Sequence, residues 1–324
     1  MRDHGGDLDR ARAAFGGSDW IDLSTGINAI AYPVPPLPSH ALIALPTGSD
    51  IRALETVAAR AYGTRTSIVA LAGAQAAIQL MPRLAPAGRA AVLTPTYNEH
   101  AAALRAQGWA VEDAPDPEAM AGADLAVVVN PNNPDGRQWT PDVLERLAGR
   151  VGLLVVDESF ADPCPRLSLA PRLADLGERV LVLRSFGKFF GLAGLRLGFA
   201  LGGAETVAHL RSLAGPWAVG GPAIVTGMAA LSDRKWHRET CRRLARDAAR
   251  LDGLAAGSGW RLVGGTPLFR TYETGDAATV QNWLARAAIW TRRFPYSTGW
   301  LRLGLPGTEA AWQRLEAALA RQGQ

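Results

Sequence analysis

Residues 185–199 read SFGKFFGLAGLRLGF and contain one lysine, Lys188. It lies between an apolar run, residues 180–183, and a glycine-rich segment, residues 191–198, so we expect little water around its amine. Burial disfavours the ammonium form of a lysine and leaves a free amine that can attack an aldehyde. Taken alone, Lys188 is better explained as a surface lysine at the end of a strand, because lysines are seldom buried. The rest of the chain decides between these interpretations.

The composition is that of an ordinary soluble globular protein. The chain has 324 residues, of which 48% are hydrophobic and 20% charged, which is enough apolar material for two medium-sized cores. The net charge of +4 is not concentrated in blocks that would indicate binding to nucleic acid or to a membrane, and it suits anionic small molecules. No apolar run could cross a bilayer and residues 1–12 are polar, so we expect a cytoplasmic protein.

The cysteines and histidines do not indicate a metal site. The two cysteines, Cys164 and Cys241, are far apart and have no CxxC spacing, so we expect two free thiols. The five histidines show no HxxxH or HExxH pattern, and at least four of them are interpreted as ordinary surface or core residues.

Short apolar runs alternate with helical patterns through the middle of the chain. They lack polar alternation, which is typical of strands that are covered on both faces. The runs are residues 68–72, 90–94, 110–113, 125–129, 153–156, 180–183 and 197–201. We therefore predict a large α/β domain, residues 41–232, with a mainly parallel sheet covered by helices on both faces.

The two ends of the chain predict a smaller α+β domain. Residues 233–324 combine strand candidates at 260–263, 268–273, 289–294 and 300–305 with helical patterns at 233–256, 277–288 and from 308. Residues 1–40 are rich in glycine and carry four prolines between positions 33 and 38. We therefore expect an arm without helix or sheet, apart from a short strand at residues 20–24, that packs on the small domain.

Polar residues follow three of the predicted strands. The segment NPNNPDG, residues 130–136, follows one strand, Asp157 follows the next, and Lys188 follows the third. Because the carboxyl ends of parallel strands share one crevice, Asn133, Asp157 and Lys188 can meet there. Each has an ordinary interpretation as a turn or cap residue. Those interpretations do not explain the whole set, which also includes the SxxK spacing and Arg196 eight residues after Lys188.

With these motifs the chain resembles the fold-type I pyridoxal phosphate enzymes, the aspartate aminotransferase-like superfamily, over nearly its whole length. The resemblance implies that Lys188 forms a Schiff base with pyridoxal 5'-phosphate and that Asp157 pairs with the protonated ring nitrogen. It also implies that Asn133 contacts the phenolic oxygen and that Tyr97 stacks on the ring. The implied phosphate contacts are Ser185, Arg196 and the amides of Ala74 and Gln75, which begin a helix after Gly73.

Two positions depart from the superfamily pattern. Phe160 stands where many relatives have a tyrosine that contacts the phenolic oxygen, so the cofactor would depend more on Asn133. Leu45 lies in the turn where relatives commonly have a tyrosine that reaches the phosphate of a neighbouring subunit. The resemblance implies a homodimer, and in this chain that one contact between subunits would be absent.

Four further segments resemble the threonine-phosphate decarboxylase branch of cobalamin synthesis. They are HGGD (residues 4–7), DLSTGIN (22–28), DESFAD (157–162) and WLRLGLPG (300–307). The resemblance implies decarboxylation of L-threonine O-3-phosphate, a small anionic amino acid, through a Schiff base with the substrate. It further implies that Arg302 holds the carboxylate and that the remaining substrate contacts come from Arg292, in preference to Arg293, with His4, Gly26 and Asn28.

The residues leave the type of reaction open. Decarboxylation and transamination begin alike and differ in which bond of Cα is perpendicular to the cofactor ring. An aminotransferase of the histidinol-phosphate type, acting on a phosphate-bearing amino donor, therefore remains an alternative. A catalytically silent binding protein is a third, against which the intact Lys188, Asp157 and Arg196 argue.

Overall fold

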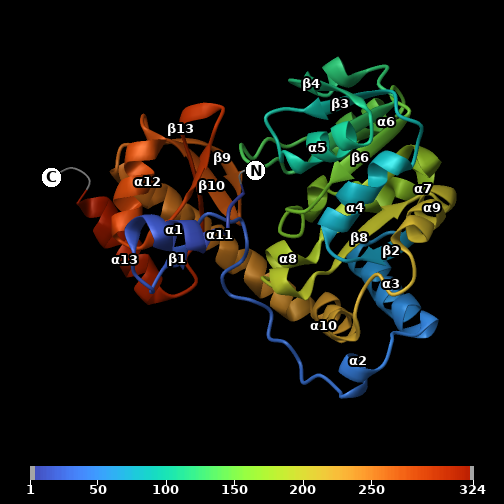
Figure 1. The fold of residues 1–324 in the computed structure, drawn as a ribbon, viewed down its shortest axis with the longest axis horizontal. Helices are drawn as coiled ribbons and strands as arrows, with labels where there is room; N and C mark the ends of the chain where they lie inside the picture. Colours follow the sequence, from blue (N-terminus) through green and yellow to red (C-terminus); the bar gives the residue numbers. More distant parts are fainter. Residues whose placement is uncertain (1–3, 322–324) are drawn as a thin grey trace. The chain divides into compact units, whose positions relative to one another are not determined.

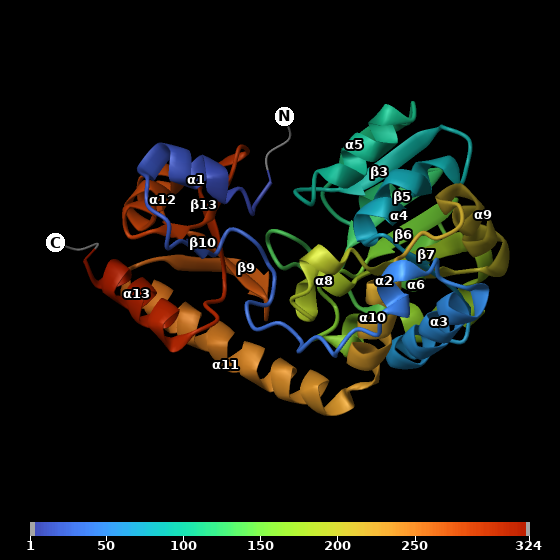
Figure 2. The same cartoon turned by 60° about the horizontal axis from the view of Figure 1, so that its bottom comes forward.

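The computed structural model describes residues 4–321, and its contacts divide the chain into two compact units (Figures 1 and 2). The larger unit comprises Tyr32–Asn133 and Gln138–Trp236. The smaller unit contains the N-terminal segment up to Ala31, the short segment Pro134–Arg137, and the chain from His237 onward. The chain thus first passes from the smaller to the larger unit after residue 31, where the sequence analysis expected residue 40. Residues 134–137 belong to the smaller unit, which the sequence did not indicate.

The larger unit is built on a seven-stranded sheet with the order β2-β8-β7-β6-β5-β3-β4. All neighbouring strands are parallel except β8, which is antiparallel to both β2 and β7. Every residue of β5, β6 and β8 is buried, as expected for continuous apolar strands covered on both faces. The prediction of a mainly parallel α/β sheet is confirmed. The strands are β2 (Ser67–Leu71), β3 (Arg89–Leu93), β4 (Ala110–Ala114), β5 (Leu125–Val129), β6 (Leu153–Asp157), β7 (Val180–Ser185) and β8 (Gly198–Gly202).

Helices flank this sheet (Figure 1). The longest within the larger unit, α3, begins at a capping box formed by Thr47 and Asp50 and ends at Gly63, whose φ of 68° suits glycine. A large apolar core lies where α4, α5 and α9 pack on the sheet, with Ile78, Leu104 and Leu210 among its buried residues. The helices are α2 (His40–Ile43), α3 (Gly48–Tyr62), α4 (Ala74–Leu80), α5 (Glu99–Ala106), α6 (Pro141–Ala148), α7 (Leu173–Leu176), α8 (Phe186–Phe189), α9 (Ala204–Ala214), α10 (Gly221–Ser232) and the first turn of α11 (Arg234–Gly257).

The smaller unit is an α+β structure. Its antiparallel sheet has the order β12-β13-β10-β9, and a second, two-stranded sheet pairs β1 with β11 in parallel. No helix within residues 4–321 is both long and apolar enough to cross a membrane. The elements are α1 (Leu8–Phe15), β1 (Ile21–Asp22), β9 (Arg261–Thr266), β10 (Phe269–Glu273), α12 (Ala277–Arg286), β11 (Ile289–Trp290), β12 (Arg292–Phe294), β13 (Ser297–Gly304) and α13 (Glu309–Ala320), together with most of α11.

The expectation of an N-terminal arm without helices is wrong, because α1 lies inside it and α2 begins at its end. The carboxylate of Asp7 caps α1 by accepting a hydrogen bond from the backbone N–H of Arg10 at 3.1 Å. Ala11 is fully buried, and the ring of Phe15 lies 6.4 Å from those of Trp20 and Trp290. Tertiary packing of this apolar face therefore stabilises a helix in a segment whose glycine content indicates a loop.

Candidate active site

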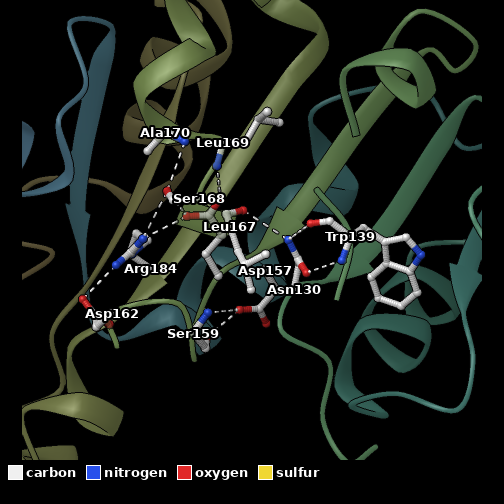
Figure 3. Close-up of polar contacts among 11 residues, drawn as sticks. Asn130, Trp139, Asp157, Ser159, Asp162, Leu167, Ser168, Leu169, Ala170 and Arg184 are labelled. Atoms are coloured by element: carbon white, nitrogen blue, oxygen red, sulfur yellow. Dashed lines mark hydrogen bonds and ion pairs between the residues drawn. The ribbon is translucent and has the colours of Figure 1, made fainter. Parts of the chain in front are cut away.

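Asp157 ends β6 and is only 3% exposed. Its Oδ1 accepts hydrogen bonds from the backbone N–H and the hydroxyl of Ser159, at 2.9 and 2.5 Å (Figure 3). Its Oδ2 lies 2.9 Å from Nε2 of His100. Burial alone would raise the pKa of Asp157, but His100 and the hydrogen bonds from Ser159 outweigh burial and hold the pKa below its ordinary value. The side chain is therefore a carboxylate near neutral pH, as pairing with a protonated ring nitrogen requires.

His100 is a site residue that the sequence interpretation missed. It lies in α5, is fully buried, and its ring meets that of Tyr97 edge to face at 6.0 Å. Within residues 4–321 its Nδ1 has no hydrogen-bond partner. The available signal was its position three residues after Tyr97, in the helix that follows β3.

We expect His100→Phe to weaken the binding of pyridoxal phosphate by about 10- to 100-fold, since a hydrogen bond to a charged group contributes about 1.5–3 kcal/mol. Without this partner, Asp157 loses one of the contacts that hold its pKa below the ordinary value against burial, and its carboxylate holds a ring proton less well. Absorbance titration of the apoprotein with the cofactor measures the dissociation constant. His209→Phe, at an exposed position of α9, is the matched control. Equal affinities in the two variants would contradict this role of His100.

Tyr97 connects the beginnings of α4 and α5. Its hydroxyl donates to Oε1 of Gln75 at 3.2 Å, and Nε2 of Gln75 donates to Oε2 of Glu99 at 3.2 Å. His100 connects Tyr97 to Asp157, because its ring packs against that of Tyr97 and its Nε2 lies next to Oδ2 of Asp157. The structure therefore brings together three residues that the resemblance assigned to the cofactor: Tyr97, Gln75 and Asp157.

Two glycines let three phosphate-binding candidates approach one another. Gly73, with φ 79°, is the N-cap of α4, and a Cβ there would lie 2.7 Å from Nη2 of Arg196. A Cβ on Gly198 would lie 2.4 Å from the backbone nitrogen of Ala74, and Gly198 pairs with Ser185 across β7 and β8. A guanidinium, a hydroxyl and N–H groups of a helix start are thereby gathered at one place. This is the set of donors that phosphate takes.

Lys188 lies in the short helix α8 and is half-buried. Its Nζ is 5.8 Å from the centre of the Phe160 ring, so the amine lies near the residues that follow β6. Asn133 is half-buried, and its neighbour Asn132 is hydrogen-bonded to Pro95 and Thr96, which precede Tyr97. A carboxylate, an amine and a group of phosphate donors in one unit fit pyridoxal phosphate.

In the smaller unit, two arginines that the resemblance assigned to the substrate are neighbours across β12 and β13. Arg302 pairs with Arg292 in the register, is 6% exposed, and donates from Nη2 to the carbonyl oxygen of Ser24 at 2.7 Å. Its guanidinium carbon lies 5.1 Å from the ring centre of Phe269. Burial, and next the positive charge of Arg292, lower the pKa of Arg302 to about 10. Arg302 is nevertheless a cation at neutral pH and can bind an anion.

The smaller unit also contains a cavity of about 380 Å³. His4, Ser24, Arg292 and Arg293 contribute to its lining, whereas Gly26, Asn28 and Arg302 are not among the described residues that line it. Arg293 is fixed by Gln281, whose Oε1 accepts from Nε at 2.6 Å. Gly26 is buried, and Oδ1 of Asn28 accepts from Arg243 and from the backbone N–H of Ile30, at 2.6 and 3.1 Å.

Comparisons with known proteins give a family for the chain. Residues 44–319 match the family model for aminotransferase class I and II. The chain is 43% identical to a threonine-phosphate decarboxylase of Pseudomonas aeruginosa, over 98% of this chain and 97% of that protein. It is 35% identical to a histidinol-phosphate aminotransferase of Mycobacterium bovis, over 76% and 71% of the two chains.

A solved structure has the same fold. The histidinol-phosphate aminotransferase of Sinorhizobium meliloti, in complex with pyridoxal-5'-phosphate, superposes with a TM-score of 0.83 at 21% identity, covering 97% of this chain and 93% of that one. The family match and the near full-length relative lead to one conclusion: the chain belongs to the aminotransferase class I and II family.

Proposed function

We propose that the chain catalyses the decarboxylation of L-threonine O-3-phosphate to (R)-1-aminopropan-2-yl phosphate, a step of cobalamin biosynthesis. The observation that carries this proposal is the 43% identity with the threonine-phosphate decarboxylase of Pseudomonas aeruginosa over nearly all of both chains. In the reaction the bond between Cα and the carboxylate breaks, CO2 leaves, and Cα gains a proton. Pyridoxal 5'-phosphate is the cofactor, and when bound it accepts the electron pair that CO2 leaves behind.

The proposal gives the residues of the larger unit two tasks. The first is to hold the cofactor: Asp157 would bind the ring nitrogen, Asn133 the phenolic oxygen, and Tyr97 the face of the ring. The second is the movement of a proton, since the side chain of Lys188 in its ammonium form can donate a proton to Cα of the substrate. The phosphate contacts are assigned to Ser185, Arg196 and the backbone N–H groups of Ala74 and Gln75.

The proposal assigns the two anionic ends of the substrate to the smaller unit. Arg302 holds the carboxylate, and the phosphate is bound by Arg292 and His4, which both line the 380 Å³ cavity. The proposal also assigns Gly26 and Asn28, in the segment after Ser24, to substrate binding. Arginine suits both ends because its guanidinium makes paired hydrogen bonds to carboxylate and phosphate.

Arg292 and Arg293 offer a matched pair for testing the phosphate assignment. We expect Arg292→Ala to raise KM for threonine phosphate by about 10- to 100-fold, because a hydrogen bond to a charged group contributes about 1.5–3 kcal/mol. Arg293→Ala should change KM much less, since Nε of Arg293 already donates to Gln281. Steady-state kinetics with threonine phosphate and with threonine, which lacks the phosphate, makes the comparison. If Arg293→Ala has the larger effect on the phosphorylated substrate alone, the two assignments must be exchanged.

The type of reaction is tested by the products. The holoenzyme is incubated with threonine phosphate, and released CO2 and 2-oxo acid are measured with and without 2-oxoglutarate. We expect CO2 in both cases. A 35% identity with the histidinol-phosphate aminotransferase of Mycobacterium bovis favours transamination as the second candidate. Formation of 2-oxo acid only when 2-oxoglutarate is present, with no CO2, would replace the first proposal by the second.

We also propose that the protein is a homodimer in the cytoplasm. Three apolar side chains in and just after α2 are strongly exposed: Leu42 at 71%, Ile43 at 82% and Leu45 at 65%. A second copy of the chain would cover these side chains. Sedimentation equilibrium should therefore give twice the mass of one chain. The mass of a single chain at micromolar concentration would contradict the dimer. Cys164 and Cys241 do not form a disulfide with each other, which suits a reducing compartment, and cell fractionation can check this.

A further inference from the structure

A buried group of charges joins the ends of two strands that carry cofactor residues. Arg184 immediately precedes Ser185 at the end of β7, and Glu158 immediately follows Asp157 at the end of β6. The two strands lie side by side, and the backbone N–H of Glu158 donates to the carbonyl oxygen of Leu183 at 2.9 Å. Each member of this charged pair is therefore the sequence neighbour of a residue that we assign to the cofactor.

The guanidinium of Arg184 is held by two carboxylates (Figure 3). Nη1 donates to Oε2 of Glu158 at 2.9 Å and Nη2 donates to Oδ1 of Asp162 at 2.8 Å. The side chains of the three residues are 5%, 0% and 5% exposed, and the ring of Tyr62 covers the guanidinium carbon at 4.3 Å. Water is thus almost excluded from the group.

Glu158 accepts two further hydrogen bonds. Ser168 donates from Oγ to Oε2 at 2.5 Å, and the backbone N–H of Leu169 donates to Oε1 at 2.6 Å. The group therefore ties the ends of β6 and β7 to the segment around Ser168. Because successive side chains of a strand point to opposite faces, Arg184 projects away from the face on which Ser185 lies. The charges are connected to the cofactor contacts through the backbone and do not touch the cofactor themselves.

Stability alone is a weak reason for such a group. Buried ion pairs can often be replaced by apolar residues of similar volume without loss of stability, because removing two charges from water is costly. Two carboxylates face one guanidinium, and burial raises the pKa of Glu158 in spite of the charge of Arg184. What the group does specify is geometry, since a fork of N–H donors fixes the relative positions of the two carboxylates.

We propose that Arg184 is a positioning residue for the cofactor: through Glu158 and Asp162 it fixes the spacing between Asp157 and Ser185, so that both ends of pyridoxal phosphate are held at once. The inference rests on the cofactor contacts of the proposed function. Its consequence is that the affinity for the cofactor depends on a side chain that makes no contact with it.

The test replaces the fork of donors by a single charge. Arg184→Lys keeps the positive charge, but an ammonium group cannot present the same planar pair of donors to both carboxylates. We expect the dissociation constant of pyridoxal phosphate, measured by absorbance titration of the apoprotein, to rise at least tenfold. We also expect a shift in the pH at which the absorbance of the lysine-bound cofactor changes, because Asp157 no longer lies in the same place relative to the ring.

The control is a second arginine in the same unit. Arg211 makes paired hydrogen bonds to Glu55, at 2.9 and 3.0 Å, that involve no residue assigned to the cofactor. Arg211→Lys should lower Tm and leave the cofactor dissociation constant and spectrum unchanged. If Arg184→Lys behaves in the same way, the group is merely structural and the proposal is wrong.

A milder variant covers the case in which Arg184→Lys does not fold. Asp162→Asn retains an oxygen that accepts from Arg184 but removes one charge, and the same two measurements apply, with a smaller increase in the dissociation constant expected. An unchanged constant and spectrum in this variant would overturn the proposal. Neither measurement uses a substrate, so a failed CO2 assay and a failed positioning role are distinguishable.

Discussion

Replacement of Lys188 by alanine is expected to abolish turnover, with a loss on the order of 10⁴-fold or more, as found when a nucleophile is removed from a catalytic group that acts as a unit. The physical reason is that no other side chain supplies an amine at this place. The chain has only two lysines, and the second, Lys235, is exposed in the first turn of α11. The variant should bind the cofactor without forming the covalent bond.

The low lysine content makes this experiment unusually direct. Borohydride reduction of the holoenzyme fixes the cofactor to the lysine that carries it, and only two peptides can bear the label. We expect the label on Lys188 and loss of the visible absorbance in Lys188→Ala. Lys235→Ala is the matched control and should retain both colour and turnover. Label on Lys235, or a visible band that persists in Lys188→Ala, would contradict the role of Lys188.

The fold was predictable where a buried strand appears in the sequence as an uninterrupted run of apolar residues. The run Leu125–Val129 matches β5 residue for residue, since a strand covered on both faces has no polar position to interrupt it. The helix α1 was missed because it depends on contacts with distant residues: Phe15 packs on Trp290, far away in the chain. Glycine and proline content describes local preference, and here tertiary packing overrides it.

The candidate site was predictable for residues at the ends of strands, because topology brings these ends together whatever the side chains are. His100 was not predictable in this way. It lies within a helix, where a buried histidine is usually part of the core, and only the fold reveals that its Nε2 faces Asp157 at 2.9 Å. Arg184 left a signal that was not used, since an arginine directly after the apolar residues 180–183 must find buried partners.

Arg302→Ala is expected to lower kcat/KM by about 10²- to 10⁴-fold while the affinity for pyridoxal phosphate stays the same. Two hydrogen bonds between a guanidinium and a carboxylate contribute about 1.5–3 kcal/mol each, and the substrate loses both. Arg314→Ala, at the ion pair with Asp19 in the same unit, is the control and should change neither quantity. Arg302 does not act on the substrate if Arg302→Ala weakens the binding of the cofactor and keeps full activity once the cofactor is saturating.

The same residue predicts how activity depends on pH. Because burial and Arg292 lower the pKa of Arg302 to about 10, its guanidinium is charged below that pH and loses its proton above it. An anionic substrate binds the charged form, so kcat/KM of the wild type should fall as the pH rises through about 10. Other groups titrate in this range, so the contribution of Arg302 is isolated by dividing kcat/KM of the wild type by kcat/KM of Arg302→Ala at each pH. That ratio should be large and constant at neutral pH. It should decrease toward one at higher pH, because the wild type then lacks the charge that the variant also lacks. A ratio that stays constant through pH 11 would mean that the charge of Arg302 does not bind the carboxylate.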